Sequence, residues 1–87
     1  MSWELRTRVE FDRAIKKLDK PIRQRVLASL HEVAALEDPR SRGKGLTGRL
    51  SGLWRYRVGD YRVEVEILDA EIVIVAVNVG HRSEIYG

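Results

Sequence analysis

A Gly-Asp pair between two alternating runs of residues is the feature that most constrains how this chain folds. Residues 54–58 (WRYRV) and 61–67 (YRVEVEI) each alternate apolar and charged side chains, which is the period of a β-strand with one buried face. Gly59 and Asp60 between them predict a two-residue hairpin turn with glycine first, as in a type II′ turn. The chain is therefore expected to contain a β-hairpin whose register is set by this turn.

The register divides the hairpin into an apolar face and a charged face. Counting outward from the turn, Arg57 lies opposite Arg62, and Arg55 lies opposite Glu64. Two guanidinium groups directly opposite each other destabilise a hairpin by roughly a few tenths of a kcal/mol or more. This pair therefore requires an acidic neighbour or an external anion, because three guanidinium groups exceed the charge of Glu64 and Glu66. The expected pairs are Val58–Tyr61, Arg57–Arg62, Tyr56–Val63, Arg55–Glu64 and Trp54–Val65.

The rest of the chain predicts two helices and two further strands. Residues 3–9 alternate as a half-buried strand, and the apolar stripes of 11–18 and 22–36 are typical of helices separated by Lys20-Pro21. Residues 40–52 are rich in glycine and predict a loop, and the run 72–79 is apolar at both parities, as in a central strand. We therefore expect one α+β domain over residues 1–87 with the order β-α-α-β-β-β. Its two helices would pack on one face of a mainly antiparallel four-stranded sheet, and its arginine face would lie partly open.

Composition excludes several classes of site. The 87 residues include no cysteine, which excludes disulfides, thiol nucleophiles and cysteine-ligated zinc, and only two histidines, His31 and His81. His31 falls midway along the second helix and is interpreted as an ordinary helix residue. The longest wholly apolar run has six residues, Ile72 to Val77, against the roughly 20 that a membrane helix needs. A cytoplasmic domain without a metal, a cofactor or a membrane partner is expected.

Positive charge is concentrated in the middle of the chain. The net charge is +3, but residues 40–62 carry seven Lys/Arg against Asp60 alone, a local balance of 7 − 1 = +6. Clustered arginine is typical of phosphate contacts, because it favours both counterion release and bidentate hydrogen bonding. A basic surface loop that keeps the protein soluble is the alternative.

The tail adds groups that suit proton transfer. Gly80 is expected to end the last strand, so that His81 and Arg82 emerge at its tip. His81 titrates near neutrality if unperturbed, and the Tyr86 hydroxyl can donate or accept a hydrogen bond. As the alternative, His81 and Arg82 are exposed loop residues and Tyr86 packs over the last strand.

The segment LWRYRVGDYRV (53–63), the closing GHR…Y (80–86) and the Phe-x-x-Ala-x-x-x-Leu helix at 11–18 resemble the RelE toxins of bacterial toxin–antitoxin systems. The resemblance spans nearly the whole chain. It implies the RelE/ParE fold and an mRNA endonuclease that acts in the ribosomal decoding site. It also implies inhibition by a RelB-like antitoxin in a hetero-oligomeric complex. No helix-turn-helix pattern is visible, so direct DNA binding is not expected without the antitoxin.

The same resemblance assigns an active surface to the hairpin and the tail. It places cationic residues at Arg55, Arg57 and Arg62, the tail arginine at Arg82 and the near-terminal tyrosine at Tyr86. In the expected metal-free reaction the 2′-hydroxyl attacks its own 3′-phosphate. Arginine suits the phosphate charge and transfers protons poorly. We therefore expect Arg57, Arg62 and Arg82 to hold the phosphate, with Arg55 assisting. His81 is expected to transfer a proton, and Tyr86 to position the 2′-hydroxyl or to join that transfer. Contacts to RNA or the ribosome are expected from Arg40, Arg42, Lys44 and Arg49.

This nuclease hypothesis requires the guanidinium groups, the imidazole and the phenol to converge in one nucleotide-sized pocket. A toxin of the ParE branch, which shares the fold but poisons DNA gyrase without cleaving RNA, is the first alternative. A non-catalytic RNA-binding module that stacks bases on Trp54 or Tyr56 is the second, and an inactive, degenerate toxin is the third.

Overall fold

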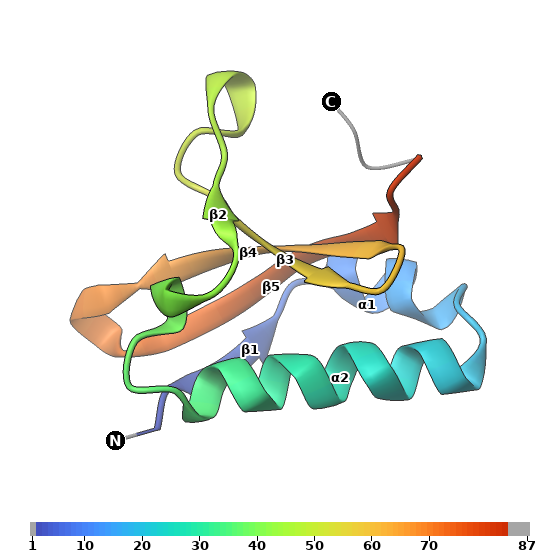
Figure 1. The fold of residues 1–87 in the computed structure, drawn as a ribbon, viewed down its shortest axis with the longest axis horizontal. Helices are drawn as coiled ribbons and strands as arrows, with labels where there is room; N and C mark the ends of the chain where they lie inside the picture. Colours follow the sequence, from blue (N-terminus) through green and yellow to red (C-terminus); the bar gives the residue numbers. More distant parts are fainter. Residues whose placement is uncertain (1, 84–87) are drawn as a thin grey trace.

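The computed structural model describes residues 2–83, and the strands in this range form one mixed sheet (Figure 1). The sheet has the order β1-β5-β4-β3-β2, in which β1 runs parallel to β5 and all other neighbours are antiparallel. The strands are β1 (Glu4–Thr7), β2 (Lys44–Gly45), β3 (Trp54–Val58), β4 (Tyr61–Leu68) and β5 (Val73–His81).

Two helices connect β1 to the rest of the sheet, as the apolar stripes predict. Helix α1 (Val9–Lys16) carries acidic residues in its first turn and basic residues in its last, which complements the helix dipole. Helix α2 (Lys20–Ala35) has Pro21 at its start, where proline costs no hydrogen bond. Neither described helix has the length and hydropathy needed to cross a membrane.

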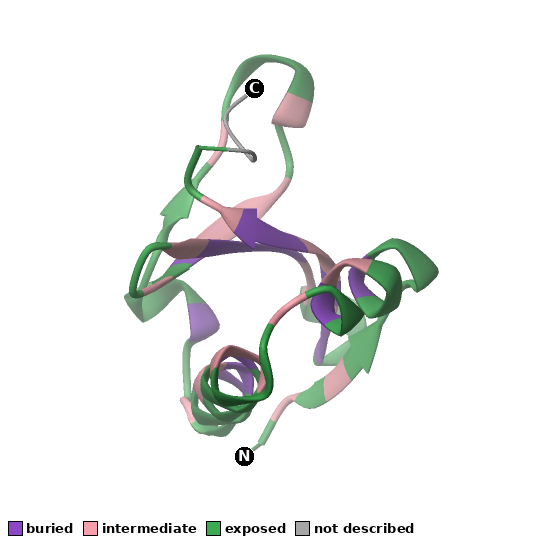
Figure 2. Ribbon diagram, turned by 90° about the vertical axis from the view of Figure 1, so that its right-hand side faces the viewer, coloured by how far each residue is buried: buried purple, intermediate pink, exposed green. Residues whose placement is uncertain are grey.

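The core lies between these helices and one face of the sheet. Figure 2 shows the buried segments of both helices turned toward the buried middle of the strands. Phe11 of α1 and Leu30 of α2 pack there with Val63 of β4 and Ile74 of β5, each at most 1% exposed. The alternation of β3 and β4 therefore directs their apolar side chains toward the helices and their charged side chains to the opposite face.

The hairpin register matches the prediction pair for pair, from Val58–Tyr61 at the turn to Trp54–Val65. Gly59 has a φ of +59°, whereas Asp60 is not among the residues with positive φ, as a type II′ turn requires. The α+β class and the packing of both helices on one face are likewise confirmed.

Three boundaries differ from the sequence-based expectation. The sheet has five strands rather than four, because part of the glycine-rich loop forms the short strand β2 beside β3. The first strand ends at Thr7 and α1 already begins at Val9. The last strand begins at Val73, after Ile72 takes a left-handed conformation (φ +55°), and it continues through Gly80 and His81.

Candidate nucleic-acid interface

A cationic cavity of about 400 Å³ lies on the face of the sheet that the helices leave uncovered. It is lined by Gly43 and Lys44 at the start of β2 and by Arg55, Arg57 and Arg62 of the hairpin. The hairpin register brings the three arginines together, since all three occupy the charged face of adjacent strands. We call this site the arginine cavity.

Arg57 and Arg62 form its unneutralised part. They lie directly opposite each other across β3 and β4, and within residues 2–83 neither makes an ion pair. Arg57 is exposed, whereas Arg62 is 9% exposed and its Nη1 atom lies 3.3 Å from the carbonyl oxygen of Tyr61. The charge repulsion that the sequence predicted is therefore present in the fold.

Arg55, which lines the arginine cavity, is paired with Glu64. The Nη2 atom of Arg55 donates to a carboxylate oxygen of Glu64 at 3.3 Å, and the two side chains are only 11% and 6% exposed. The burial of Glu64 was not predicted; the only signal in the sequence was its register position opposite Arg55. Among residues 2–83, the four cationic side chains that line the arginine cavity and this one carboxylate beside Arg55 give a formal charge of 4 − 1 = +3.

The wall of the cavity depends on a glycine that sequence reasoning did not single out. Gly43 has a φ of +76°, and a Cβ atom at this position would lie 2.3 Å from the carbonyl oxygen of Arg55. Only glycine permits so close an approach. It brings the next residue, Lys44, into register with Arg55 and thereby adds a fourth cation to the cavity.

His81 does not join these arginines. It pairs with Tyr61 on the helix side of the sheet, where the two rings meet edge to face with centroids 5.5 Å apart. There it borders a second cavity of about 450 Å³, whose other wall includes Lys17 and Leu18, next to the C-terminal end of α1. The expectation that the imidazole shares one pocket with the guanidinium groups is wrong, because β5 extends through His81 and strand alternation turns its ring toward α1.

The two other predicted tail residues are placed differently. The main-chain N–H of Arg82 donates to the carbonyl oxygen of Asp60 at 2.8 Å, so this exposed residue lies beside the hairpin turn. Tyr86 falls outside the described residues.

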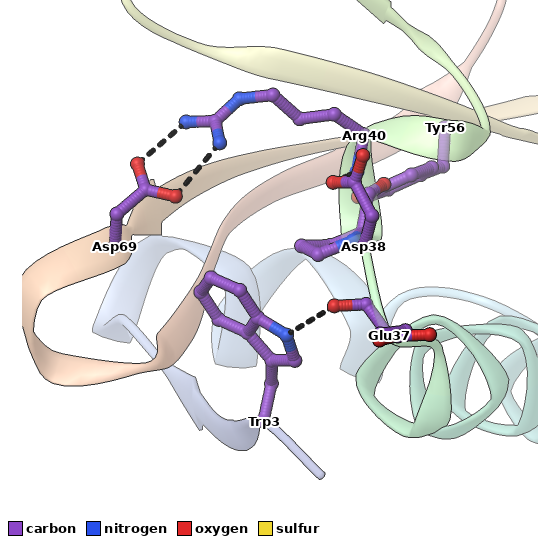
Figure 3. Close-up of polar contacts among 7 residues, drawn as sticks. Trp3, Glu37, Asp38, Arg40, Tyr56 and Asp69 are labelled. Carbon is purple, nitrogen blue, oxygen red and sulfur yellow. Dashed lines mark hydrogen bonds and ion pairs between the residues drawn. The ribbon is translucent and has the colours of Figure 1, made fainter. Parts of the chain in front are cut away.

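Of the four basic residues expected to contact RNA or the ribosome, Arg40 and Arg42 make ion pairs within the protein. Figure 3 shows the Arg40 guanidinium group bonded to both carboxylate oxygens of Asp69, at 2.8 and 2.9 Å. Arg42 pairs with Glu32 at 3.3 Å. Arg49 is exposed on the loop between β2 and β3, which rises from the sheet on the side away from α2 (Figure 1). Lys44 is thus the one of the four that lines the arginine cavity.

Contacts of the 36–42 segment hold this part of the chain against the sheet. The Trp3 indole donates to the Glu37 carbonyl oxygen at 3.3 Å (Figure 3), and the Tyr56 hydroxyl donates to that of Pro39 at 2.6 Å. Burial raises the pKa of Tyr56 to about 12. The hydrogen bond from Arg40 lowers the pKa of Asp69 below its usual value.

The chemistry available in the arginine cavity is that of anion binding. Guanidinium groups donate to phosphate oxygens bidentately and stay charged at any physiological pH. Within residues 2–83, no cluster of three or more histidine or acidic side chains is arranged to hold a metal ion.

Comparison with known proteins identifies the family and supports the fold. The sequence model of the family described as "ParE toxin of type II toxin-antitoxin system, parDE" matches residues 5–86. The toxin–antitoxin complex RelBE2 of Mycobacterium tuberculosis contains a chain that is 29% identical, with a TM-score of 0.74 over 95% of this chain and 94% of that one. The archaeal RelE–RelB complex of Pyrococcus horikoshii gives 26% identity and a TM-score of 0.73 over 94% and 97%.

A free mutant of the E. coli toxin RelE is 22% identical, with a TM-score of 0.79 over 98% of this chain and 88% of that one, and supports the fold alone. A search of the curated proteins finds no relative. Because the family model spans nearly the whole chain, this protein belongs to the RelE/ParE superfamily and is a toxin of a type II toxin–antitoxin system.

Proposed function

We propose that this toxin is a metal-independent, ribosome-dependent mRNA endonuclease whose arginine cavity binds the scissile phosphate. The observation that carries the proposal is the opposed pair Arg57–Arg62, which has no neutralising carboxylate within residues 2–83. A fold that keeps two guanidinium groups opposite each other has a site for an anion, and a phosphodiester supplies one.

The reaction is a transfer within the RNA. The 2′-oxygen forms a bond to phosphorus and the bond from phosphorus to the 5′-oxygen breaks, leaving a 2′,3′-cyclic phosphate and a 5′-hydroxyl. Arg57 and Arg62 stabilise the charge that grows on the phosphoryl oxygens, and preorganised donors of this kind contribute roughly 10²–10³-fold each. Arg82, beside the hairpin turn, is proposed as a further phosphate contact.

Proton transfer is not assigned to His81, because the sheet separates its ring from the arginine cavity. Tyr86 matches the near-terminal tyrosine of RelE toxins, and we retain for it the expected role of positioning the 2′-hydroxyl or joining the proton transfer. The ribosome then supplies much of the substrate positioning. This fits a cavity that is lined by cationic side chains and by no histidine.

A RelB-like antitoxin is the proposed inhibitor in the cytoplasm. The similar structures from M. tuberculosis and P. horikoshii are both complexes of RelE-type toxins with antitoxins. An acidic antitoxin segment would neutralise the arginine cavity. Contacts to ribosomal RNA are proposed for Lys44, which lines the arginine cavity, and for Arg49, which is exposed on the loop between β2 and β3.

Gyrase inhibition is the second candidate. The matching family model is named for ParE toxins, and the separation of His81 from the arginines removes the one histidine that the nuclease hypothesis placed in the pocket.

One experiment separates the two. Purified toxin is incubated with ribosomes stalled on a defined message, the cleavage sites are mapped, and a gyrase supercoiling assay is run beside it. We expect cleavage by the wild-type protein and by Lys16→Ala, a matched loss of charge on the exposed side of α1, and at least a 100-fold slower reaction for Arg57→Ala. Inhibition of supercoiling without RNA cleavage would assign the toxin to the ParE branch.

A further inference from the structure

We infer that Glu64 is a positioning residue that holds Arg55 in place for phosphate binding. The inference rests on the proposed function for its consequence in catalysis, but the contact itself is a property of the fold. Nothing in the resemblance to RelE toxins or in the alternation of β4 requires an acidic residue at this position.

The burial of the pair shows why Glu64 matters. A carboxylate that is 6% exposed is costly to desolvate unless a partner compensates its charge, as for any buried ion. Its partner Arg55 is itself 11% exposed and lines the arginine cavity. The cost is offset only while the guanidinium group stays against the carboxylate, so Glu64 keeps a long side chain in one orientation.

The positioning has a consequence for reactivity. An arginine whose side chain moves freely loses rotamer entropy each time it binds a phosphate. A guanidinium group whose orientation is already fixed loses less of it, which is the basis of electrostatic preorganisation. Glu64 also removes one unit of positive charge from the cavity, so it weakens the binding of RNA before reaction while it supports the reaction itself.

Glu66 provides the matched control. It lies two residues further along β4, on the same face, and is likewise ion-paired, in this case with Arg8. Neither glutamate lines the arginine cavity, but the partner of Glu64, Arg55, does so, whereas Arg8 does not. Glu64→Gln and Glu66→Gln therefore make the same chemical change, one beside a cavity arginine and one away from the cavity.

The contact is tested first by NMR of the full-length protein, with the Nε–Hε signal of Arg55 identified by its loss in Arg55→Gln. We expect a sharp, dispersed signal in the wild-type protein and in Glu66→Gln, and a broadened or undispersed one in Glu64→Gln. An unchanged Arg55 signal in Glu64→Gln would overturn the inference. If Glu64→Gln does not fold, Glu64→Asp, which keeps the charge but shortens the reach to Arg55, takes its place with the same expected loss of dispersion.

The consequence is tested by cleavage on programmed ribosomes and by binding of a single-stranded RNA oligonucleotide. For Glu64→Gln we expect kcat to fall about tenfold or more while RNA binds about threefold tighter at low salt, because one negative charge has been removed. In an Arg55→Gln background, Glu64→Gln should leave kcat unaltered. If Glu64 acts only through Arg55, it has no separate effect once Arg55 has been replaced.

Equal kcat values for Glu64→Gln and Glu66→Gln, or additive effects in the double variant, would refute the positioning role. If the wild-type protein cleaves nothing, the proposed function is wrong, and the inference is then judged by the Arg55 signal and by RNA binding. In that case a Glu64→Gln variant that binds RNA no more tightly than Glu66→Gln would overturn it.

Discussion

The ring of Tyr61 meets the imidazole of His81 edge to face on the helix side of the sheet, with 5.5 Å between centroids. The next residue on β4, Arg62, lines the arginine cavity on the other side, because successive strand residues point to opposite faces. One layer of sheet thus separates the imidazole of His81 from the arginines that are proposed to bind phosphate.

This separation predicts that His81→Ala cleaves ribosome-bound mRNA within about threefold of the wild-type rate. Arg62→Ala should lose roughly 100-fold or more, because it removes a donor from the phosphoryl oxygens. Single-turnover cleavage of a message on stalled ribosomes measures both. A large loss of activity in His81→Ala, with an unchanged thermal midpoint of unfolding, would show that the imidazole takes part in the cleavage reaction.

The opposed arginines predict a trade between stability and activity. Arg57→Gln removes the like-charge contact with Arg62 and should raise the free energy of unfolding by about 0.2–1 kcal/mol, the range of cross-strand charge effects. Cleavage should fall about 100-fold in the same variant. Urea unfolding at low salt measures the first effect, and programmed ribosomes measure the second.

Lys16→Gln is the control for Arg57→Gln, since it removes one positive charge from the exposed side of α1. It should leave cleavage nearly unchanged and should not raise stability, because a positive charge in the last turn of α1 interacts favourably with the helix dipole. The stabilisation in Arg57→Gln should also shrink at high salt, because added ions screen the repulsion between exposed charges. A gain that persisted at high salt would point to packing rather than charge.

The hairpin could be predicted residue by residue because its turn leaves little freedom. Gly59-Asp60 sets the register, and the register alone places Arg55 opposite Glu64 and Arg57 opposite Arg62. The two helices were predictable for a similar reason, since their apolar stripes have one period and clear stops at proline.

What the sequence could not provide depends on long-range contacts. Strand β2 forms because Gly43 allows the loop to touch the main chain of β3, and no local pattern in a glycine-rich segment indicates such a neighbour. The placement of His81 depended on how far β5 extends past Gly80. That extension comes from pairing with Tyr61 and from the Arg82–Asp60 hydrogen bond across the hairpin, rather than from propensity.

The close approach at Gly43 predicts a large loss of stability in Gly43→Ala. The added Cβ atom would meet the Arg55 carbonyl oxygen at 2.3 Å, a backbone atom that cannot move without disturbing β3. We expect a destabilisation of about 3 kcal/mol or more, together with loss of cleavage as Lys44 leaves its register. Thermal unfolding followed by circular dichroism measures the change.

Gly48→Ala separates this clash from backbone strain. Gly48 also has a positive φ, +67°, but a Cβ atom there would meet nothing within 4 Å. Its replacement should cost only the strain of a left-handed alanine, about 1–2 kcal/mol. Equal losses in the two variants would mean that β2 does not pack against Arg55 as described.

The buried phenol of Tyr56 predicts a loss of stability at high pH. Burial raises its pKa in the folded protein to about 12, whereas the pKa of an exposed tyrosine is about 10. Because the folded-state pKa is the higher one, the stabilisation is fully present below about pH 10 and is lost as the pH rises toward about 12, where the unfolded chain ionises first. Denaturant unfolding at a series of pH values from 8 to about 11.5 follows this loss, and in Tyr56→Phe the part due to this phenol should disappear.

The Tyr56→Phe variant should also be about 1 kcal/mol less stable at neutral pH, since the carbonyl oxygen of Pro39 loses its donor. Identical pH profiles for the two proteins would show that the hydroxyl titrates as if exposed, and the contact that holds the segment before β2 against β3 would then be absent in solution.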